Sequence, residues 1–288
     1  MRHTAPITAI SLLFVASAVA QDHAARGLVI DVDRTHHRIV VSCDPVPGYM
    51  DAMDMPFRVR DTKQLDAIKP GTIVRFTIVG RGSAPFAKDI RPVANFEPEP
   101  AEAGSLSALN SAVNSSSVSS PVAIDQVVPD FRLTDQAGRA TSLSQFRGKV
   151  VALTFGYSRC PNPNYCLRLS RNLEQVERRF HDRAGRDLIL LTIAIDPEYD
   201  RGPALAAYAR SFDANPERWH FLTGSVLQIH QVAGMFGMNF WSTEGLLTHS
   251  LHTVIIDRDG RLAANIDGNQ FSAQQLGDFV KAVMNRSN

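Results

Sequence analysis

A polar segment from Glu97 to Pro121 divides this 288-residue chain into two parts of different hydrophobic periodicity. The segment is rich in Ser, Ala, Glu and Pro and has almost no large apolar residue, so it cannot bury enough surface to order itself. We expect a flexible linker at 97–121 whose ends lie roughly 25–30 Å apart on average, which lets the flanking parts touch. The position of this polar segment therefore predicts two folded domains, one on each side of it.

The part before the linker contains short stretches with strand character. The predicted strands are Gly27–Asp33, Arg38–Cys43, Met55–Arg60, Thr72–Val79 and Asp89–Val93. Turn residues separate them, as at Asp44–Gly48 and Lys69–Gly71. Five short strands in about seventy residues favour a small closed barrel over an open sheet. We expect an all-β barrel domain at 26–95.

The part after the linker, 123–288, alternates between strand-like and helix-like stretches. The predicted strands are Val150–Phe155, Leu188–Ile195, Trp219–Leu222 and Thr253–Asp257, with a further short antiparallel strand after the turn Asp257–Arg261. The predicted helices are Leu167–Asp182, Ala204–Phe212, Val226–Phe236 and Ser272–Val283. Such alternation predicts an α/β sheet with parallel strand pairs.

The first twenty residues have the features of a secretory signal. Ile7 to Val19 is mostly apolar, and Ala18-Val19-Ala20 forms an A-x-A cleavage site before Gln21. We expect a signal peptide at 1–20 and a mature protein in a bacterial periplasm. The alternative is a retained membrane anchor with the protein facing the periplasm. The formal net charge of +1 gives no reason to expect a nucleic-acid partner.

Two of the three cysteines, Cys160 and Cys166, lie in a proline-rich loop between a predicted buried strand and a predicted helix. Pro161 and Pro163 disfavour helical backbone at the residues before them, so the loop can fold back and bring the thiols together. Helix-end N–H groups at such a junction favour thiolate over thiol. The pair suits a redox disulfide or a two-thiolate metal chelate, and a passive structural pair is the alternative.

A metal at this pair needs a third ligand, for which His249 is the best candidate. It stands in a polar break, 242–250, before the strand predicted at Thr253–Asp257. A loop that enters a central strand lies at a sheet end, where α/β proteins place their sites. His252 competes with it, but His252 begins the strand, so an inward hydrogen-bonded role suits it better. A structural role for His249 also remains open.

The barrel part holds a second group of sulfur-bearing residues: Cys43, Met53 and Met55, with Met50 nearby. Met53 and Met55 are two residues apart, so they project to the same face of an extended strand. Thioether sulfur suits Cu(I) and binds hard cations poorly. The alternative is that these methionines fill the barrel core.

Five motifs of the second part occur in the order of a known family. They are Phe155–Pro161, Ile195–Asp200, Ala207–Phe212, Pro216–Gly224 and His249–Gly260. Through them, about 124–284 resembles the Sco (SenC) family of cytochrome oxidase assembly proteins, which have a thioredoxin-like fold. The resemblance implies that Cys160, Cys166 and His249 correspond to the family's copper ligands.

The spacing of the thiols departs from that family's usual motif, because five residues separate them here in place of three. We expect the longer loop to alter the bite angle at copper and the strain of a disulfide. The departure leaves room for a role dominated by thiol redox chemistry. A peroxiredoxin is disfavoured, since Tyr157 occupies the position of that family's Thr.

The first part resembles the CusF-type periplasmic copper carriers, which are small OB-like barrels. The matching segments are Asp44-Pro45, Pro47-Gly48 and Met50–Phe57. The resemblance implies that Met53 and Met55 match the methionine ligands and that Cys43 stands where the family has a histidine. An all-sulfur site would favour Cu(I) further and be sensitive to oxidation.

Together these features predict a two-domain copper protein, an OB-like barrel followed by a thioredoxin-like α/β domain. We expect a copper chaperone for cytochrome c oxidase assembly, with the copper-site subunit of the oxidase or another periplasmic copper protein as its partner. Two alternatives stay open. One is a thiol-disulfide oxidoreductase that keeps a partner's copper-binding cysteines reduced, and the other is a copper buffer for metal tolerance.

Overall fold

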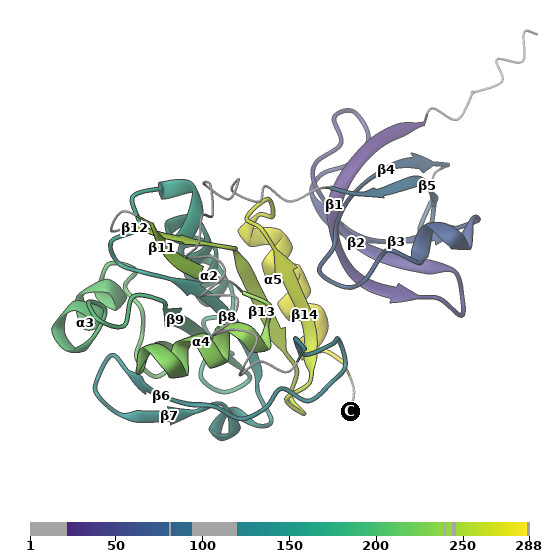
Figure 1. The fold of residues 1–288 in the computed structure, drawn as a ribbon. Helices are drawn as coiled ribbons and strands as arrows, with labels where there is room; N and C mark the ends of the chain where they lie inside the picture. The colour runs from purple at the N-terminus through teal and green to yellow at the C-terminus, as the bar shows by residue number, and fades with distance from the viewer. Residues whose placement is uncertain (1–21, 81, 94–119, 239, 244–245, 287–288) are drawn as a thin grey trace, which may run out of the picture.

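The structure is a computed structural model that describes residues 22–80, 82–93, 120–238, 240–243 and 246–286. These residues form two bodies, a β barrel and a larger α/β body, which pack against each other (Figure 1). The predicted signal peptide and nearly all of the predicted linker lie outside the described residues. None of the described helices is both long and apolar enough to cross a bilayer.

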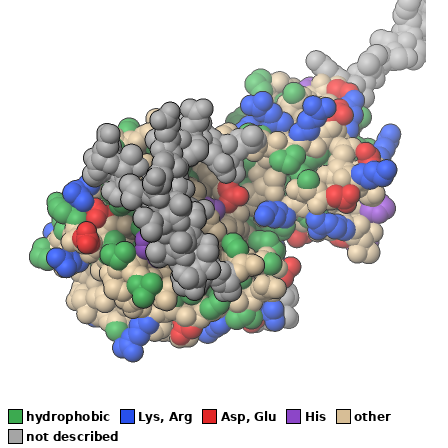
Figure 2. Space-filling model, viewed as in Figure 1, with side chains coloured by type: hydrophobic (Ala, Val, Ile, Leu, Met, Phe, Trp, Pro, Cys, Tyr) green, Lys and Arg blue, Asp and Glu red, His purple; other side chains and the backbone are tan. Residues whose placement is uncertain are grey.

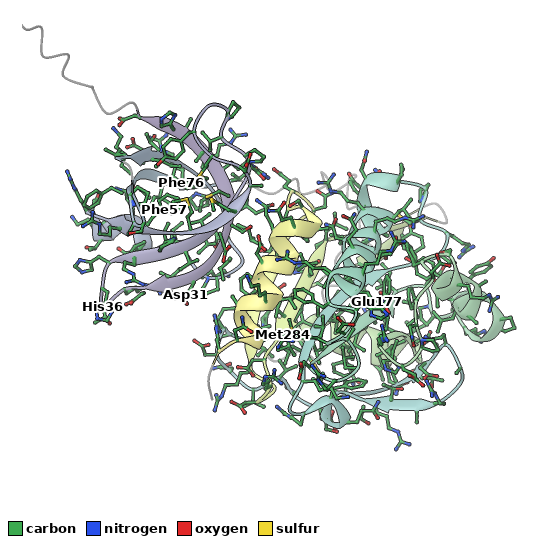
Figure 3. All side chains as sticks on the ribbon, turned by 180° about the vertical axis from the view of Figure 1, so that it is seen from behind. Asp31, His36, Phe57, Phe76, Glu177 and Met284 are labelled. Carbon is green, nitrogen blue, oxygen red and sulfur yellow. The ribbon has the colours of Figure 1, made fainter. Side chains whose placement is uncertain are left out.

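The first body is a closed five-stranded barrel with strand order β1-β2-β3-β5-β4. Its strands are β1 (His23–Asp33), β2 (Arg38–Cys43), β3 (Met53–Val59), β4 (Ile73–Val79) and β5 (Phe86–Pro92). A short 3-10 helix, η1 (Thr62–Leu65), follows β3. Phe57 and Phe76 meet edge to face inside the barrel, with ring centroids 4.9 Å apart (Figure 3). The closed barrel predicted from the five strand-like stretches is confirmed.

The second body is built on a seven-stranded sheet with strand order β14-β13-β8-β9-β10-β6-β7. These strands are β6 (Arg132–Asp135), β7 (Ala140–Ser142), β8 (Val150–Gly156), β9 (Leu188–Ala194), β10 (Trp219–Thr223), β13 (His252–Ile256) and β14 (Leu262–Asp267). The central strands β8, β9 and β10 are parallel, and every residue of β8 and β9 is buried. Their continuous apolar sequences fit strands covered on both faces.

Helices cover both faces of this sheet. They are η2 (Leu143–Phe146), η3 (Pro163–Leu167), α2 (Arg168–Arg179), α3 (Gly202–Arg210), α4 (Val226–Met235) and α5 (Ala273–Met284). Apolar side chains of α2, α3 and α5 share one core, and those of α4 belong to the core on the other face. The side chain of Ser272 accepts a hydrogen bond from Gln275 N and caps α5, at the position the sequence predicts. The predicted α/β thioredoxin-like class is confirmed.

Two sequence predictions need correction. The polar break at 242–250 is not a loop: it forms most of a hairpin of β11 (Phe240–Thr243) and β12 (Leu246–His249). These strands are four residues long, too short for alternation to be recognised. The strand that follows, β13, is second from the sheet edge and not central. The short strands β6 and β7 were not anticipated.

The barrel packs on α5 and β14 of the second body, and α5 (yellow) lies between the two (Figures 1 and 3). Leu28, Ile30 and Ile73 of the barrel belong to the same buried core as α2 and α5. Gly71, at φ +91°, comes so close to β14 that a Cβ there would lie 3.2 Å from Ile266 Cγ1. The two bodies therefore share a continuous apolar interface. Charged side chains of both signs lie around it on the surface (Figure 2).

Candidate metal centre

The cysteine loop leaves the carboxyl end of β8 and returns at the start of α2. Within η3, a π-type turn, Tyr165 departs from helical dihedrals with φ −103° and ψ −106°. Cys166 lies in this turn, two residues before α2 begins at Arg168.

Cys166 and His249 are in direct contact. The distance between Cys166 Sγ and His249 Nε2 is 3.2 Å, and the two residues are 1% and 5% exposed. His249 Nδ1 lies 2.8 Å from the carbonyl oxygen of Ser250. Because a carbonyl only accepts, Nδ1 carries the proton and Nε2 keeps its lone pair. Nε2 can thus accept the Cys166 proton or bind a metal ion.

The β11–β12 hairpin carries His249 to the thiols. His249 pairs with Phe240 across the hairpin, and the Phe240 ring stacks on His230 of α4 with centroids 4.1 Å apart. From the other side, the hydroxyl of Tyr157 donates to the Leu247 carbonyl at 3.1 Å. The hairpin is therefore fixed both to α4 and to the first residues of the cysteine loop.

Strand direction explains why His249 meets the loop. β13 runs antiparallel to β8, with Thr253 opposite Thr154, so the start of β13 lies at the end of β8. His249 is the last residue of β12, three positions before β13 begins. The expected location at a sheet end is right, although the residue stands in a strand and not in a loop.

The two thiols have opposite proton affinities. The Cys166 thiol hydrogen-bonds the Cys160 sulfur and, with His249, lowers the pKa of Cys160 from 9.0 to about 4, although burial opposes the shift. The same contact and burial raise the pKa of Cys166 well above its ordinary value. Cys160 is half-buried and Cys166 buried, and both are free thiols. The pair therefore combines an accessible thiolate with a protected thiol.

Two aspartates hold the start of the loop. The buried carboxylate of Asp200 accepts hydrogen bonds from the backbone N–H of Ser158, at 2.9 Å, and from its hydroxyl. Asp196 pairs with Arg159, whose guanidinium lies over the Tyr199 ring at 4.3 Å. Sequence reasoning did not single out Asp200, whose signal was an acidic residue shortly after a buried strand.

His252 has both ring nitrogens engaged. Nδ1 lies 2.9 Å from Asn265 Oδ1 and 3.1 Å from Asp267 Oδ1, and Nε2 lies 3.1 Å from the Ser250 hydroxyl. A ring held in this way has no free lone pair for a metal ion. Its environment is that of a structural residue at the start of β13.

The barrel brings Cys43 and the methionines to one face. Cys43 lies directly opposite Met53, and Val41 opposite Met55, across β2 and β3. Opposite residues of antiparallel strands share a face, with Cβ atoms roughly 4.5–5.5 Å apart. Met53 is 46% exposed, whereas Cys43 is buried and its thiol donates to the Val41 carbonyl at 3.6 Å. Burial, and then Asp44, raise the pKa of Cys43 to about 12.

Neither group is a ready-made metal cage. Across the described ranges, no three His, Cys, Asp or Glu side chains are gathered to hold a metal ion. At the thiol pair, Cys166 touches His249, while Cys160 Sγ lies 3.6 Å from the Asn162 carbonyl oxygen. In the barrel, Cys43 is buried, whereas Met53 opposite it is exposed.

Comparison with known proteins assigns both bodies. The family described as SCO1/SenC matches residues 121–285, more than half of the chain. The chain belongs to the SCO1/SenC family. The family described as copper binding periplasmic protein CusF matches residues 22–92, which include the whole barrel. The predicted combination of a Sco domain with an N-terminal CusF-like domain is confirmed.

Curated members of the SCO1/SenC family give the same result. The protein SCO2 homolog, mitochondrial, of Homo sapiens is 31% identical over 162 residues, which are 54% of this chain and 59% of that protein. The Bos taurus protein of the same name is 32% identical over equal shares. The chain thus spans about three fifths of the length of these relatives.

Solved structures support the fold. A SCO1/SenC family lipoprotein from Bacillus anthracis has a TM-score of 0.50 at 20% identity, covering 55% of this chain and 95% of that one. A putative electron transfer protein from Aquifex aeolicus has a TM-score of 0.50 at 16% identity, covering 56% and 94%. At these identities the likeness concerns the fold of the second body alone.

Proposed function

We propose that the chain is a periplasmic copper carrier with two soft sites, which delivers copper for the assembly of cytochrome c oxidase. The observation that carries the proposal is the contact between Cys166 Sγ and the free Nε2 of His249, beside the Cys160 thiolate. Two thiolates and an imidazole form a donor set suited to copper. The match of the barrel to a family named for periplasmic copper binding supports both cargo and compartment.

In this proposal the barrel binds Cu(I) through Cys43, Met53 and Met55, and the second body binds it through Cys160, Cys166 and His249. Transfer proceeds by exchange of sulfur ligands between sites of similar affinity. The recipient is the copper-site subunit of the oxidase or another periplasmic copper protein. The mature protein begins after a signal peptide at 1–20, or stays anchored to the membrane by it.

Anaerobic Cu(I) titration of the full chain tests the ligand assignment. We expect the Cys160→Ser/Cys166→Ser variant to bind one equivalent fewer than the wild type, and the Cys43→Ser variant to lose a different equivalent. Unchanged stoichiometry in the double variant would contradict the thiol assignment. In a deletion strain, loss of oxidase activity that added copper rescues supports delivery, whereas a change in copper tolerance alone supports a buffer.

The asymmetry of the thiols favours a second candidate function, thiol-disulfide exchange. The Cys160 thiolate would attack a disulfide of a partner and form a mixed disulfide. Cys166 would then transfer its proton to His249 Nε2 and attack the Cys160 sulfur, which releases the partner as a dithiol. Two electrons pass to the partner, and a separate thiol reductant must reduce the Cys160–Cys166 disulfide. A reduction potential too low for thiol donors to reach would exclude this cycle.

A further inference from the structure

One short turn of the second body contacts both candidate sites. It comprises residues 268–272 between β14 and α5, and we call it the bridging turn. On one side, the Asn269 side-chain amide donates to the carbonyl oxygen of Asn164 in the cysteine loop, at 2.5 Å. On the other side, the Gln270 carbonyl oxygen accepts a hydrogen bond from the Arg26 guanidinium of the barrel, also at 2.5 Å.

The barrel end of this connection lies beside Cys43. A second nitrogen of Arg26 donates to Asp44 Oδ2 at 2.8 Å, and Asp44 directly follows Cys43. The amide of Gln275, in the first turn of α5, donates to Asp44 Oδ1 at 3.0 Å. The planar fork of arginine can hold two acceptors at once, so Arg26 joins the barrel strand to the bridging turn.

The thiol end of the connection contacts the cysteine loop and the helix that follows it. Asn164 N donates to Asn162 Oδ1 at 2.9 Å, and the Asn162 carbonyl is the acceptor that faces Cys160 Sγ. Beyond Cys166, the Asn172 side chain donates to the Phe271 carbonyl oxygen at 3.4 Å. The bridging turn therefore contacts the chain before and after Cys166, and the Asn164 contact lies within the loop between the two thiols.

We propose that Arg26 and Asn269 are positioning residues for the thiol pair, so that the docked barrel sets the geometry at which Cys160, Cys166 and His249 bind Cu(I). The proposal rests on the proposed function of this site. It makes the barrel part of the second site, in addition to its own sulfur ligands. The continuous apolar interface, with Leu28 and Ile73 buried in it, gives the connection a rigid base.

The test uses the full chain with Cys43→Ser, which silences the barrel site, and measures Cu(I) affinity by anaerobic competition with a chromophoric chelator. We expect Arg26→Gln and Asn269→Ala each to weaken the affinity by about three- to tenfold. The double variant should be no weaker than the worse single variant, because both act through one connection. The matched control is Arg75→Gln: Arg75 lies opposite Arg26 on β4, and its side chain forms no hydrogen bond or ion pair with any described residue.

Amide hydrogen exchange of residues 160–166 is the second measurement, since it needs no copper. We expect faster exchange in both variants and wild-type exchange in Arg75→Gln. Unchanged affinity and exchange, even with a lower melting temperature, would overturn the proposal, as would additive effects in the double variant. If the Cys43→Ser chain binds no Cu(I), the proposed function fails, and the exchange data still decide whether the connection exists.

Discussion

The pKa values of Cys160 and Cys166 are shifted in opposite directions, although only one short loop separates the two residues. Because the contact with Cys166 lowers the pKa of Cys160 to about 4, we expect Cys160 to react as a thiolate above about pH 5. We expect its alkylation rate to change less than about threefold between pH 5 and 8, where an ordinary thiol gains about tenfold per pH unit. Quenched alkylation followed by peptide mass spectrometry measures the rate for each cysteine.

The Cys166→Ala variant is the control for this rate. It removes the hydrogen bond that contributes most to the low pKa of Cys160, so the rate should regain a rise with pH. Cys166 and Cys43, both buried, should stay unmodified until the protein unfolds. A steep pH dependence in the wild type would show that Cys160 is protonated at neutral pH.

His249 and His252 are three residues apart, but they differ in whether a ring nitrogen is available to bind a metal ion. His249→Ala removes Nε2, the ring nitrogen that faces the Cys166 thiol with its lone pair. We expect this variant to bind Cu(I) at least about tenfold more weakly. His252→Ala should lower the free energy of unfolding by about 1–3 kcal/mol, because it removes a buried ring together with its hydrogen bonds to Asn265 and Ser250. Chelator competition and urea denaturation separate the two effects. Equal losses of affinity would make His252 a ligand as well.

At the scale of elements, the β11–β12 hairpin is the part whose position decides the site. Tyr157→Phe removes the hydrogen bond to the Leu247 carbonyl and should lower stability by about 0.5–1.5 kcal/mol. We also expect faster amide exchange across 246–249. Tyr199→Phe is the matched control, because the half-exposed Tyr199 ring would still lie beneath Arg159. Unchanged exchange in Tyr157→Phe would mean that α4 alone holds the hairpin.

The elements also show how far sequence reasoning reaches. Arg38–Cys43 and the start of α4 at Val226 are predicted to the residue, because turn and capping residues mark them. The Cys43–Met53 register requires cross-strand pairing, which no local pattern contains. His249 could be singled out, but its contact with Cys166 depends on the antiparallel entry of β13, which periodicity does not reveal.

At the scale of the whole molecule, adjacent residues of β1 belong to different hydrophobic cores. Leu28 is buried between the two bodies, and Val29 is buried inside the barrel. Leu28→Ala should cost about 2–5 kcal/mol and separate the unfolding of the bodies into two calorimetric transitions. Val29→Ala, the control, should lower the stability of the barrel without undocking it. A single transition in Leu28→Ala would mean that other contacts suffice for docking.

The sequence of β1 partly predicts the interface between the barrel and the second body. A barrel strand with one solvated face should alternate, yet Leu28-Val29-Ile30 is an unbroken apolar run, which is typical of burial on both faces. The sequence contains no comparable sign of where the second body would meet it. Gly71 fits beneath β14 only because it lacks a Cβ, and that requirement appears once both bodies are in place.

The π-type turn that contains Cys166 has a consequence for how such a site can diversify. Because the turn leads directly into α2 and Cys166 contacts His249, residues added to the loop before the turn need not move either of these two side chains. Loop length then becomes a tuning variable, separate from ligand identity. A change in the length of the loop between Cys160 and Cys166 would then alter the Cu(I) affinity while every ligand residue stays the same.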